Sequence, residues 1–141
     1  MGRLARAEEG RLAKAPLIAI VDDDEFFRAS MEELMESHGY SVKAFPSAAD
    51  FLASRSLAEI ACLIADIHMP AMTGLELYAR LIETGQKIPT ILVTAYPDEA
   101  RRARALKDGI VCYLLKPFDD NDLVDCVRKA VEGDKPPAEH S

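Results

Sequence analysis

The sequence predicts an α/β domain in which five β-strands alternate with five α-helices, a doubly wound (βα)5 arrangement. Short apolar runs alternate with longer segments in which apolar residues recur at about the 3.6-residue period of a helix. Four of the seven glycines directly follow these helical segments, where a left-handed residue commonly ends a helix. Strands that alternate with helices form a parallel sheet covered by helices on both faces.

The first elements are read from apolar spacing and cap residues. Residues 17–22 form an apolar run that we expect to be the first strand. Residues 24–38 are expected to be helical, ended by Gly39, and residues 41–45 form the second strand. Ser47 is a suitable N-cap for a short second helix. The apolar residues of the first helix recur at i, i+4 and i+7, at Phe27, Met31 and Leu34.

The middle of the chain repeats this order. Residues 61–66 form the third predicted strand, and Thr73 opens a helix that stops at Gly85. Residues 89–94 form the fourth strand. The inward face of the helix is expected to carry Leu75, Tyr78, Leu81 and Ile82.

The last elements complete the sheet and its cover. Residues 97–108 are predicted to form the fourth helix, which ends at Gly109. Residues 110–115 follow as the fifth strand, and residues 119–132 form the fifth helix, which ends at Gly133. The apolar residues expected to face inward from this helix are Leu123, Val127 and Val131.

Length and composition indicate one domain. The chain has 141 residues, of which 49% are hydrophobic, enough for a buried core. Residues 16–133 carry the alternating pattern and are the expected domain. Residues 1–15 lack that pattern and are expected to be a flexible N-terminal arm. Residues 134–141 are expected to be a disordered tail, because Pro136 and Pro137 cannot continue a helix.

Charge and hydropathy exclude several classes of partner. The net charge of −7 and the pI of about 4.9 argue against direct nucleic-acid binding, which needs a basic surface. No apolar run approaches the roughly 18 residues of a membrane span, and the N-terminus lacks the apolar region of a signal peptide. We therefore expect a cytoplasmic protein without membrane contact.

The three cysteines, Cys62, Cys112 and Cys126, have neither CxxC spacing nor the histidine pairing of a metal site. Two fall in predicted buried strands and one falls on a predicted helix. The expectation is therefore three plain buried or half-buried thiols in a reducing compartment.

Polar residues follow four of the five predicted strands. Because ligands of such sheets bind at the carboxyl ends of the strands, these residues are expected to form one site. The second strand ends in Phe45-Pro46 and offers no polar group, which suits an outer position. Asp24, next in the first acidic run, is expected to be a helix N-cap instead. The candidate site residues are Asp22, Asp23, Asp66, Thr94 and Lys116.

This set of residue types suits phosphoryl transfer. Three clustered carboxylates repel one another unless a cation intervenes, and Mg²⁺ favours carboxylate and phosphate oxygens. An ionised carboxylate is a nucleophile that needs no general base. A hydroxyl can donate to a phosphoryl oxygen, and an ammonium can neutralise its charge. The metal offsets the repulsion between carboxylate and phosphate.

Five sequence blocks resemble the signatures of response-regulator receiver domains, of the CheY-like superfamily. They occur in the family's order, and the resemblance covers residues 16–133 and is greatest to receivers of the FixJ type. It implies a flavodoxin-like fold with strand order 2-1-3-4-5 and a function in two-component signal transduction. The blocks are Ile20-Val21-Asp22-Asp23-Asp24, Asp66-Ile67-His68-Met69-Pro70, Thr73-Gly74-Leu75-Glu76-Leu77, Leu92-Val93-Thr94-Ala95 and Lys116-Pro117-Phe118.

The resemblance implies a role for each site residue. Asp66 would be the phosphoacceptor, receiving its phosphoryl group from a sensor histidine kinase. Asp23, Asp66 and the backbone carbonyl of His68 would bind Mg²⁺ directly, and Asp22 would act largely through water. The chain would assist its own phosphorylation and slow autodephosphorylation without being an enzyme. The phosphoryl group would be contacted by Thr94 and Lys116.

The same resemblance implies a switch and a control of lifetime. Tyr113 would be the aromatic that moves inward when Thr94 shifts, and the alternative is an ordinary strand aromatic. The Lys116-Pro117 bond would be cis, an isomer that proline makes accessible. His68 and Tyr96 stand where relatives control water access to the acyl-phosphate, and the bulk of Tyr96 favours slow hydrolysis.

The sequence does not identify the partner that would read the phosphorylation of this domain. The fourth helix carries a basic run that is either a solvated face or a docking surface for partners. Only about eight residues follow the last helix, too few for an output domain, so we expect a stand-alone receiver rather than a truncated chain. It would act on an unidentified output protein or as a phosphorelay carrier, and dimerisation is left open. The basic residues are Arg101, Arg102, Arg104 and Lys107.

Three other functions compete with this interpretation. A flavodoxin-like cofactor binder needs a cradle of Ser, Thr and Gly after the first strand, where this chain has acids. An aspartate-nucleophile phosphohydrolase needs a second acid two residues after Asp66, where this chain has His68. A receiver that binds partners without phosphorylation is disfavoured because all five site residues are present.

Overall fold

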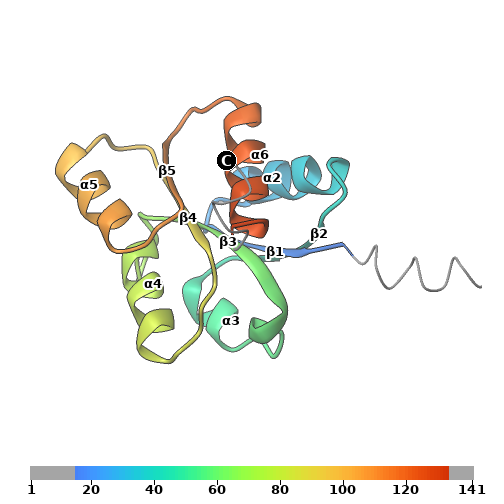
Figure 1. The fold of residues 1–141 in the computed structure, drawn as a ribbon, viewed down its shortest axis with the longest axis horizontal. Coiled ribbons are helices and arrows are strands. Elements are labelled where there is room, and N and C mark those ends of the chain that lie inside the picture. Colours follow the sequence, from blue (N-terminus) through green and yellow to red (C-terminus); the bar gives the residue numbers. More distant parts are fainter. Residues whose placement is uncertain (1–14, 134–141) are drawn as a thin grey trace, which may run out of the picture.

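A computed structural model describes residues 15–133 as a five-stranded parallel sheet flanked by helices (Figure 1). The strand order is β2-β1-β3-β4-β5, which confirms the predicted flavodoxin-like topology. No helix in this part of the chain is long and apolar enough to cross a membrane. The elements are β1 (Leu17–Val21), α2 (Glu25–Ser37), β2 (Ser41–Phe45), α3 (Ala48–Leu52), a 3₁₀ turn (Leu57–Glu59), β3 (Ile60–Asp66), α4 (Gly74–Glu83), β4 (Thr90–Thr94), α5 (Glu99–Lys107), β5 (Cys112–Leu115) and α6 (Asp120–Val131).

The N-terminal arm predicted for residues 1–15 lies outside the described residues except at Ala15, and so does the tail predicted for residues 134–141. Most predicted elements agree with the structure to within one or two residues. The 3₁₀ turn before β3 was not predicted, because a three-residue element leaves no periodic pattern.

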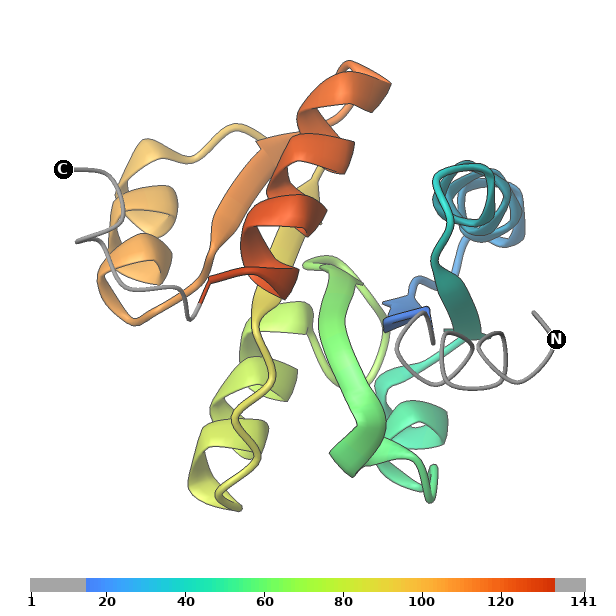
Figure 2. The same ribbon diagram turned by 45° about the vertical axis from the view of Figure 1, so that its right-hand side comes forward.

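The sheet separates two hydrophobic cores. Ile18 and Ile20 of β1 face α2 and α6, whereas Ala19 and Val21 face α3, α4 and α5. Figure 1 shows α2 and α6 together on one side of the sheet, and in Figure 2 α6 lies along β4 and β5. The central strands β1, β3 and β4 are buried on both faces, which explains their continuous apolar runs. Their carboxyl ends are therefore held rigidly.

Local capping sets the helix ends. Asp24 and Ser47 accept hydrogen bonds from backbone N–H groups as N-caps, as predicted. Asp119, which was predicted to be the first residue of the last helix, is instead its N-cap. Thr73 forms a capping box with Glu76. The helix α5 begins two residues later than predicted, because the side chain of its N-cap Asp98 accepts from the backbone of the first turn. Of the four glycines that follow helices, Gly39, Gly85 and Gly109 have positive φ, and the fourth, Gly133, does not.

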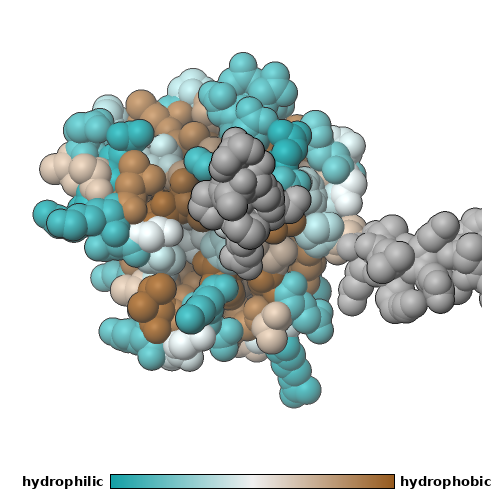
Figure 3. Space-filling view, in the orientation of Figure 1, coloured by the Kyte–Doolittle hydropathy of each residue, from teal (hydrophilic) through white to brown (hydrophobic). Residues whose placement is uncertain are grey.

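One predicted core position is wrong. Ile82 was expected to face inward from α4, but 54% of it is exposed. Leu77 and Leu81, four residues apart, are the fully buried pair on this helix, and Leu75 and Tyr78 pack beside them. Ile82 directly follows Leu81, and each residue of a helix is rotated by about 100° from the one before. This rotation turns the Ile82 side chain away from the buried face and towards solvent. The surface seen in Figure 3 is a mixture of this kind, with apolar patches separated by hydrophilic side chains.

The expectation of three free thiols is also wrong. Cys112 on β5 and Cys126 on α6 form a disulfide with a Cα–Cα distance of 6.1 Å. Only Cys62 is a free thiol, and it is buried in β3. The two bonded residues are 14 positions apart, with no spacing that signals a pair. Their proximity comes from the packing of α6 against the sheet, which no local pattern records.

Candidate functional site

The carboxyl ends of β1 and β3 bring three acids together. Val21 pairs with Ala65 in the parallel register, so the next residues, Asp22 and Asp66, extend side by side. Carboxylate oxygens of Asp22, Asp23 and Asp66 all lie within 4.8 Å of one another. Asp22 and Asp66 are buried and Asp23 is exposed. Two acids of the cluster are therefore shielded from solvent, and the third is open to it.

Lys116 bridges the two buried acids. Its Nζ lies 3.3 Å from Asp22 Oδ2 and 3.4 Å from Asp66 Oδ1. The same ammonium stands 3.9 Å from the centroid of the Phe27 ring, a favourable cation–π position. Phe118 packs edge-on against Phe27, with a centroid separation of 6.0 Å. The lysine is thus held between two carboxylates and an aromatic face, and the bond that follows it, Lys116-Pro117, is cis as predicted.

Backbone contacts hold Asp22 in place. The backbone N–H of Asp24 donates to Asp22 Oδ1 over 2.8 Å, and Arg28 Nη1 donates to the Asp22 carbonyl over 2.7 Å. Asp24 therefore has two roles, since its own side chain caps α2. The first turn of α2 orients the carboxylate that ends β1.

Asp66 is held by a close backbone approach. A Cβ placed on Gly74, the first residue of α4, would lie 2.5 Å from the carbonyl oxygen of Asp66. No side chain fits there, because real Cβ atoms essentially never come within 3.0 Å of such an atom. Ala71, in the turn between them, has a positive φ of 70°. The turn after β3 is thus packed tightly under the candidate phosphoacceptor.

Burial shifts the titration of both inner acids. Desolvation raises the pKa of Asp22 above its ordinary 3.8, against the opposing effects of the Asp24 backbone and Lys116. Desolvation likewise raises the pKa of Asp66, and the charge of Asp22 adds to it. Ionising either acid in the folded protein therefore costs free energy, and the charge of Lys116 alone does not offset that cost. A further cation would relieve that cost.

Thr94 ends β4 next to the acids. Asp66 on β3 pairs with Val93 on β4, and Thr94 is the next residue of β4. The Thr94 side chain is fully buried. Its Oγ1 accepts a hydrogen bond from the backbone N–H of Tyr96 over 3.1 Å. A threonine hydroxyl accepts and donates, so this contact leaves its proton available for another oxygen.

His68 and Tyr96 form an exposed aromatic pair. Their ring centroids are 4.6 Å apart, and the ring planes meet at 77°. One residue follows β3 and the other follows β4, so the pair joins the two loops that flank the acids. Both side chains are exposed, and the role predicted for the His68 carbonyl stays a prediction.

Tyr113 lies on β5, opposite Leu92 of β4. Its ring packs partly into the core under α4 and α5, and its buried hydroxyl has no hydrogen-bond partner among residues 15–133. An unpaired buried hydroxyl is costly, so an alternative position for this side chain is energetically reasonable. Its predicted switching role stays a prediction.

Sequence reasoning located the acids, threonine and lysine but missed their supports. The sequence marks Phe27 only as a core residue of the first helix and indicates no role for Arg28. Gly74 falls in one of the five sequence blocks, but the sequence does not show that a backbone oxygen lies against it. The predicted metal fits this set, because clustered carboxylates are ligands that Mg²⁺ prefers. Asp23 and Asp66 would hold the ion directly, and Asp22, the third acid of the cluster, would act largely through water.

Comparison with known proteins identifies the family. The chain matches the response regulator receiver domain over residues 18–128. It is 36% identical over 116 residues to the response regulator protein TmoT of Ectopseudomonas mendocina, covering 82% of this chain and 53% of TmoT. It is 34% identical over 115 residues to the transcriptional regulatory protein FixJ of Rhizobium meliloti, covering 82% of this chain and 56% of FixJ. The chain thus spans about half the length of these curated relatives.

Solved structures give the same result. The response regulator StyR superposes with a TM-score of 0.78 at 34% identity, covering 84% of this chain and 60% of StyR. The structure named FixJ-N superposes with a TM-score of 0.75 at 32% identity, covering 84% of this chain and 95% of that one. The sheet order, the acidic cluster and the family match agree, and this chain belongs to the response regulator receiver domains of two-component signal transduction.

Proposed function

We propose that this chain is a Mg²⁺-dependent phosphorylation switch whose phosphoacceptor is Asp66. The observation that carries the proposal is the position of Lys116 Nζ, within 3.4 Å of both Asp22 and Asp66. An ammonium shared by two buried carboxylates marks a place for an incoming anion, because a bound phosphoryl group can replace one acid as its partner.

The proposed reaction is an in-line phosphoryl transfer. A carboxylate oxygen of Asp66 attacks phosphorus, and the P–N bond to the phosphohistidine of a sensor histidine kinase breaks. The ring nitrogen keeps the electron pair of that bond and leaves as neutral imidazole, because the other ring nitrogen of the phosphohistidine carries a proton. Lys116 moves its ammonium to a phosphoryl oxygen, and the Thr94 hydroxyl donates a hydrogen bond to another. Mg²⁺ bound by the three acids would neutralise negative charge on the phosphoryl oxygens.

The lifetime of the acyl-phosphate would depend on water access. The edge-to-face pair of His68 and Tyr96 spans the loops after β3 and β4. We infer that this pair shields the phosphoryl group and makes autodephosphorylation slow. The proposal includes a cytoplasmic location, which is consistent with the response regulator family.

The output surface is proposed to include α5. Arg101 and Arg102 pair with Asp98 and Glu99 within one turn, at 3.7 Å and 3.1 Å. Arg104 lies exposed on the same helix, in a pocket that also contains Leu75. Partly free basic charge beside apolar surface suits an acidic partner, either an output or phosphotransfer protein or a second copy of this chain.

One experiment tests the central step. The chain is incubated with Mg²⁺ and phosphoramidate, and intact mass reports the gain of one phosphoryl group. The expected result is a gain in the natural chain, none in Asp66→Asn, and none when the metal is chelated. Asp24→Asn is the matched control, since it changes a neighbouring acid that caps α2, and it should retain the gain. A gain in Asp66→Asn, or no gain in the natural chain, would defeat the proposal.

A further inference from the structure

Cys112 and Cys126 form a second chemical site, on a different part of the fold from the acidic cluster. Cys112 is the first residue of β5, and Cys126 lies in the middle of α6. Their Cα atoms are 6.1 Å apart, within the range of about 4.4–6.8 Å that a disulfide requires. The backbone therefore holds the two sulfur atoms within bonding reach.

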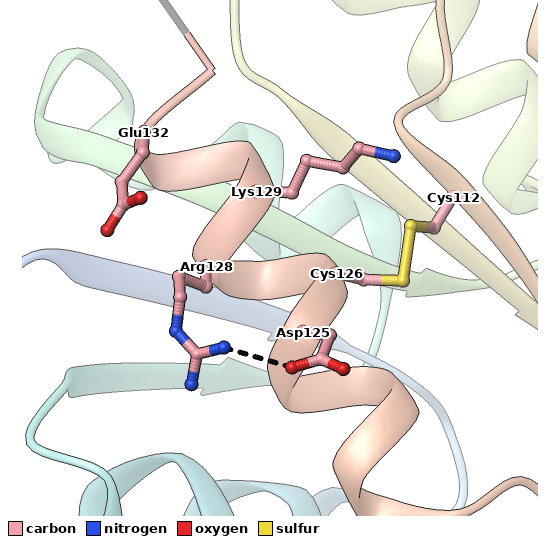
Figure 4. Close-up of a pocket in the computed structure, with 6 residues that line it drawn as sticks. All are labelled: Cys112, Asp125, Cys126, Arg128, Lys129 and Glu132. Carbon is pink, nitrogen blue, oxygen red and sulfur yellow. Dashed lines mark hydrogen bonds and ion pairs between the residues drawn. A yellow bond between two sulfur atoms is a disulfide. The ribbon is translucent and has the colours of Figure 1, made fainter. Parts of the chain in front are cut away.

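Small molecules can reach this pair from solvent. Both cysteines line an open surface pocket of about 390 Å³, together with charged residues of α6 (Figure 4). Arg128 and Asp125, which line the same pocket, pair with each other at 2.9 Å. Lys129 extends on the same side of α6 as the disulfide in Figure 4. The remaining residue of the pocket is Glu132.

The third cysteine cannot compete for the same chemistry. Cys62 is fully buried in β3, and desolvation raises the pKa of its thiol to about 12. Only the thiolate is a nucleophile in disulfide exchange. Reactivity is therefore confined to the pair that lines the pocket, of which Cys112 is half-buried and Cys126 is 9% exposed.

We propose that Cys112 and Cys126 are a reversible dithiol–disulfide site that exchanges with low-molecular-weight disulfides entering through this pocket. The Cys112 thiolate attacks one sulfur of the small disulfide, and the other sulfur leaves as a thiolate. Cys126 then attacks the Cys112 sulfur of the mixed disulfide and releases the second small thiolate. Two protein thiols thus lose two electrons and two protons, and one small disulfide becomes two small thiols.

Cross-linking has a structural consequence. The bond ties the start of β5 to α6 and closes a loop with a sequence separation of 14. A loop of this size removes unfolded-state entropy and stabilises the native state. Cys112 packs in the core under α2 and α6, whereas its neighbour Tyr113 packs in the opposite core. The site is thus independent of the proposed phosphorylation, which either redox form is expected to support.

The test uses buffers of reduced and oxidised glutathione at fixed total concentration. Intact mass and peptide mapping should show the reversible loss of two hydrogens and a single Cys112–Cys126 cross-link. The melting temperature of the oxidised chain should be higher by roughly 10 °C. Cys112→Ser and Cys126→Ser should abolish the cross-link and the temperature difference, whereas Cys62→Ala should retain both. The proposal fails if no cross-link forms in fully oxidised buffer, if reduced glutathione does not reverse it, or if it involves Cys62.

Discussion

Replacing Lys116 with methionine tests whether this ammonium holds the acidic cluster together. The substitution retains an unbranched apolar side chain next to Phe27 but removes the charge that lies 3.3 Å from Asp22 and 3.4 Å from Asp66. Each contact is worth about 5 kcal/mol at an effective dielectric constant of about 20. The cost of desolvating the lysine, whose side chain is 20% exposed, offsets much of this sum. Two buried acids then remain without a cation, and we expect a net loss of about 3 kcal/mol in the free energy of unfolding.

The loss should depend on pH. Both acids have folded-state pKa values raised above 3.8, so the folded protein holds their protons to higher pH than the unfolded chain does. Stability without metal should therefore fall as pH rises from about 3.8 through the folded-state pKa values. Removing Lys116 raises those pKa values further. The difference between variant and natural chain should be small at low pH, where the acids are protonated, and largest near pH 8.

Urea unfolding followed by circular dichroism, with divalent cations chelated, measures both effects. Lys107→Met is the matched control, because that lysine is exposed at the last residue of α5. Its free energy of unfolding should change by no more than about 0.5 kcal/mol. If Lys116→Met is as stable as Lys107→Met near pH 8, the bridging role assigned to this lysine is wrong.

Four other variants, one of them with two substitutions, test separate parts of the structure. Asp66→Asn should raise the free energy of unfolding in metal-free buffer near pH 8 by about 1–2 kcal/mol, because a neutral amide replaces a buried charge; a loss of stability in urea unfolding would contradict this. Gly74→Ala should cost about 2 kcal/mol or more, since its Cβ would lie 2.5 Å from a backbone oxygen, and unchanged stability would show that the turn can yield. Tyr96→Ala should shorten the lifetime of the phosphorylated chain several-fold, as followed by mass spectrometry, and an unchanged decay would remove the shielding role. Reversing Arg101 and Arg104 to Glu should weaken binding of the phosphorylated chain to its partner while phosphorylation proceeds normally; for a second copy of this chain, sedimentation measures the affinity, and an unchanged value would exclude this face.

Local signals explain why most of the fold was predictable. Helix starts depend on cap residues a few positions away, and Asp24, Ser47 and Thr73 act as predicted. Continuous apolar runs predicted the buried parallel strands. The prediction for Ile82 was wrong because its apolar character suggested an inward position, whereas the packing of α4 buries Leu77 instead.

The candidate site was predictable to the level of its charged residues. Strand-end positions in the sequence predicted Asp22, Asp66 and Thr94 as site residues, because parallel strands present their carboxyl ends at one edge. The supports of the site were not predictable in the same way. Phe27 lies under Lys116 only because α2 and the loop after β5 meet in space.

The amino-acid sequence by itself determined which chemical groups this receiver carries and the strand from which each one projects. Periodicity, caps and strand ends are short-range properties, so residues a few positions apart suffice to reveal them. Only the tertiary structure decided the contact between Lys116 and Asp22, which are 94 positions apart, and the bond between Cys112 and Cys126. Such contacts depend on how helices pack against the sheet, and packing geometry is set by the whole core rather than by any local pattern.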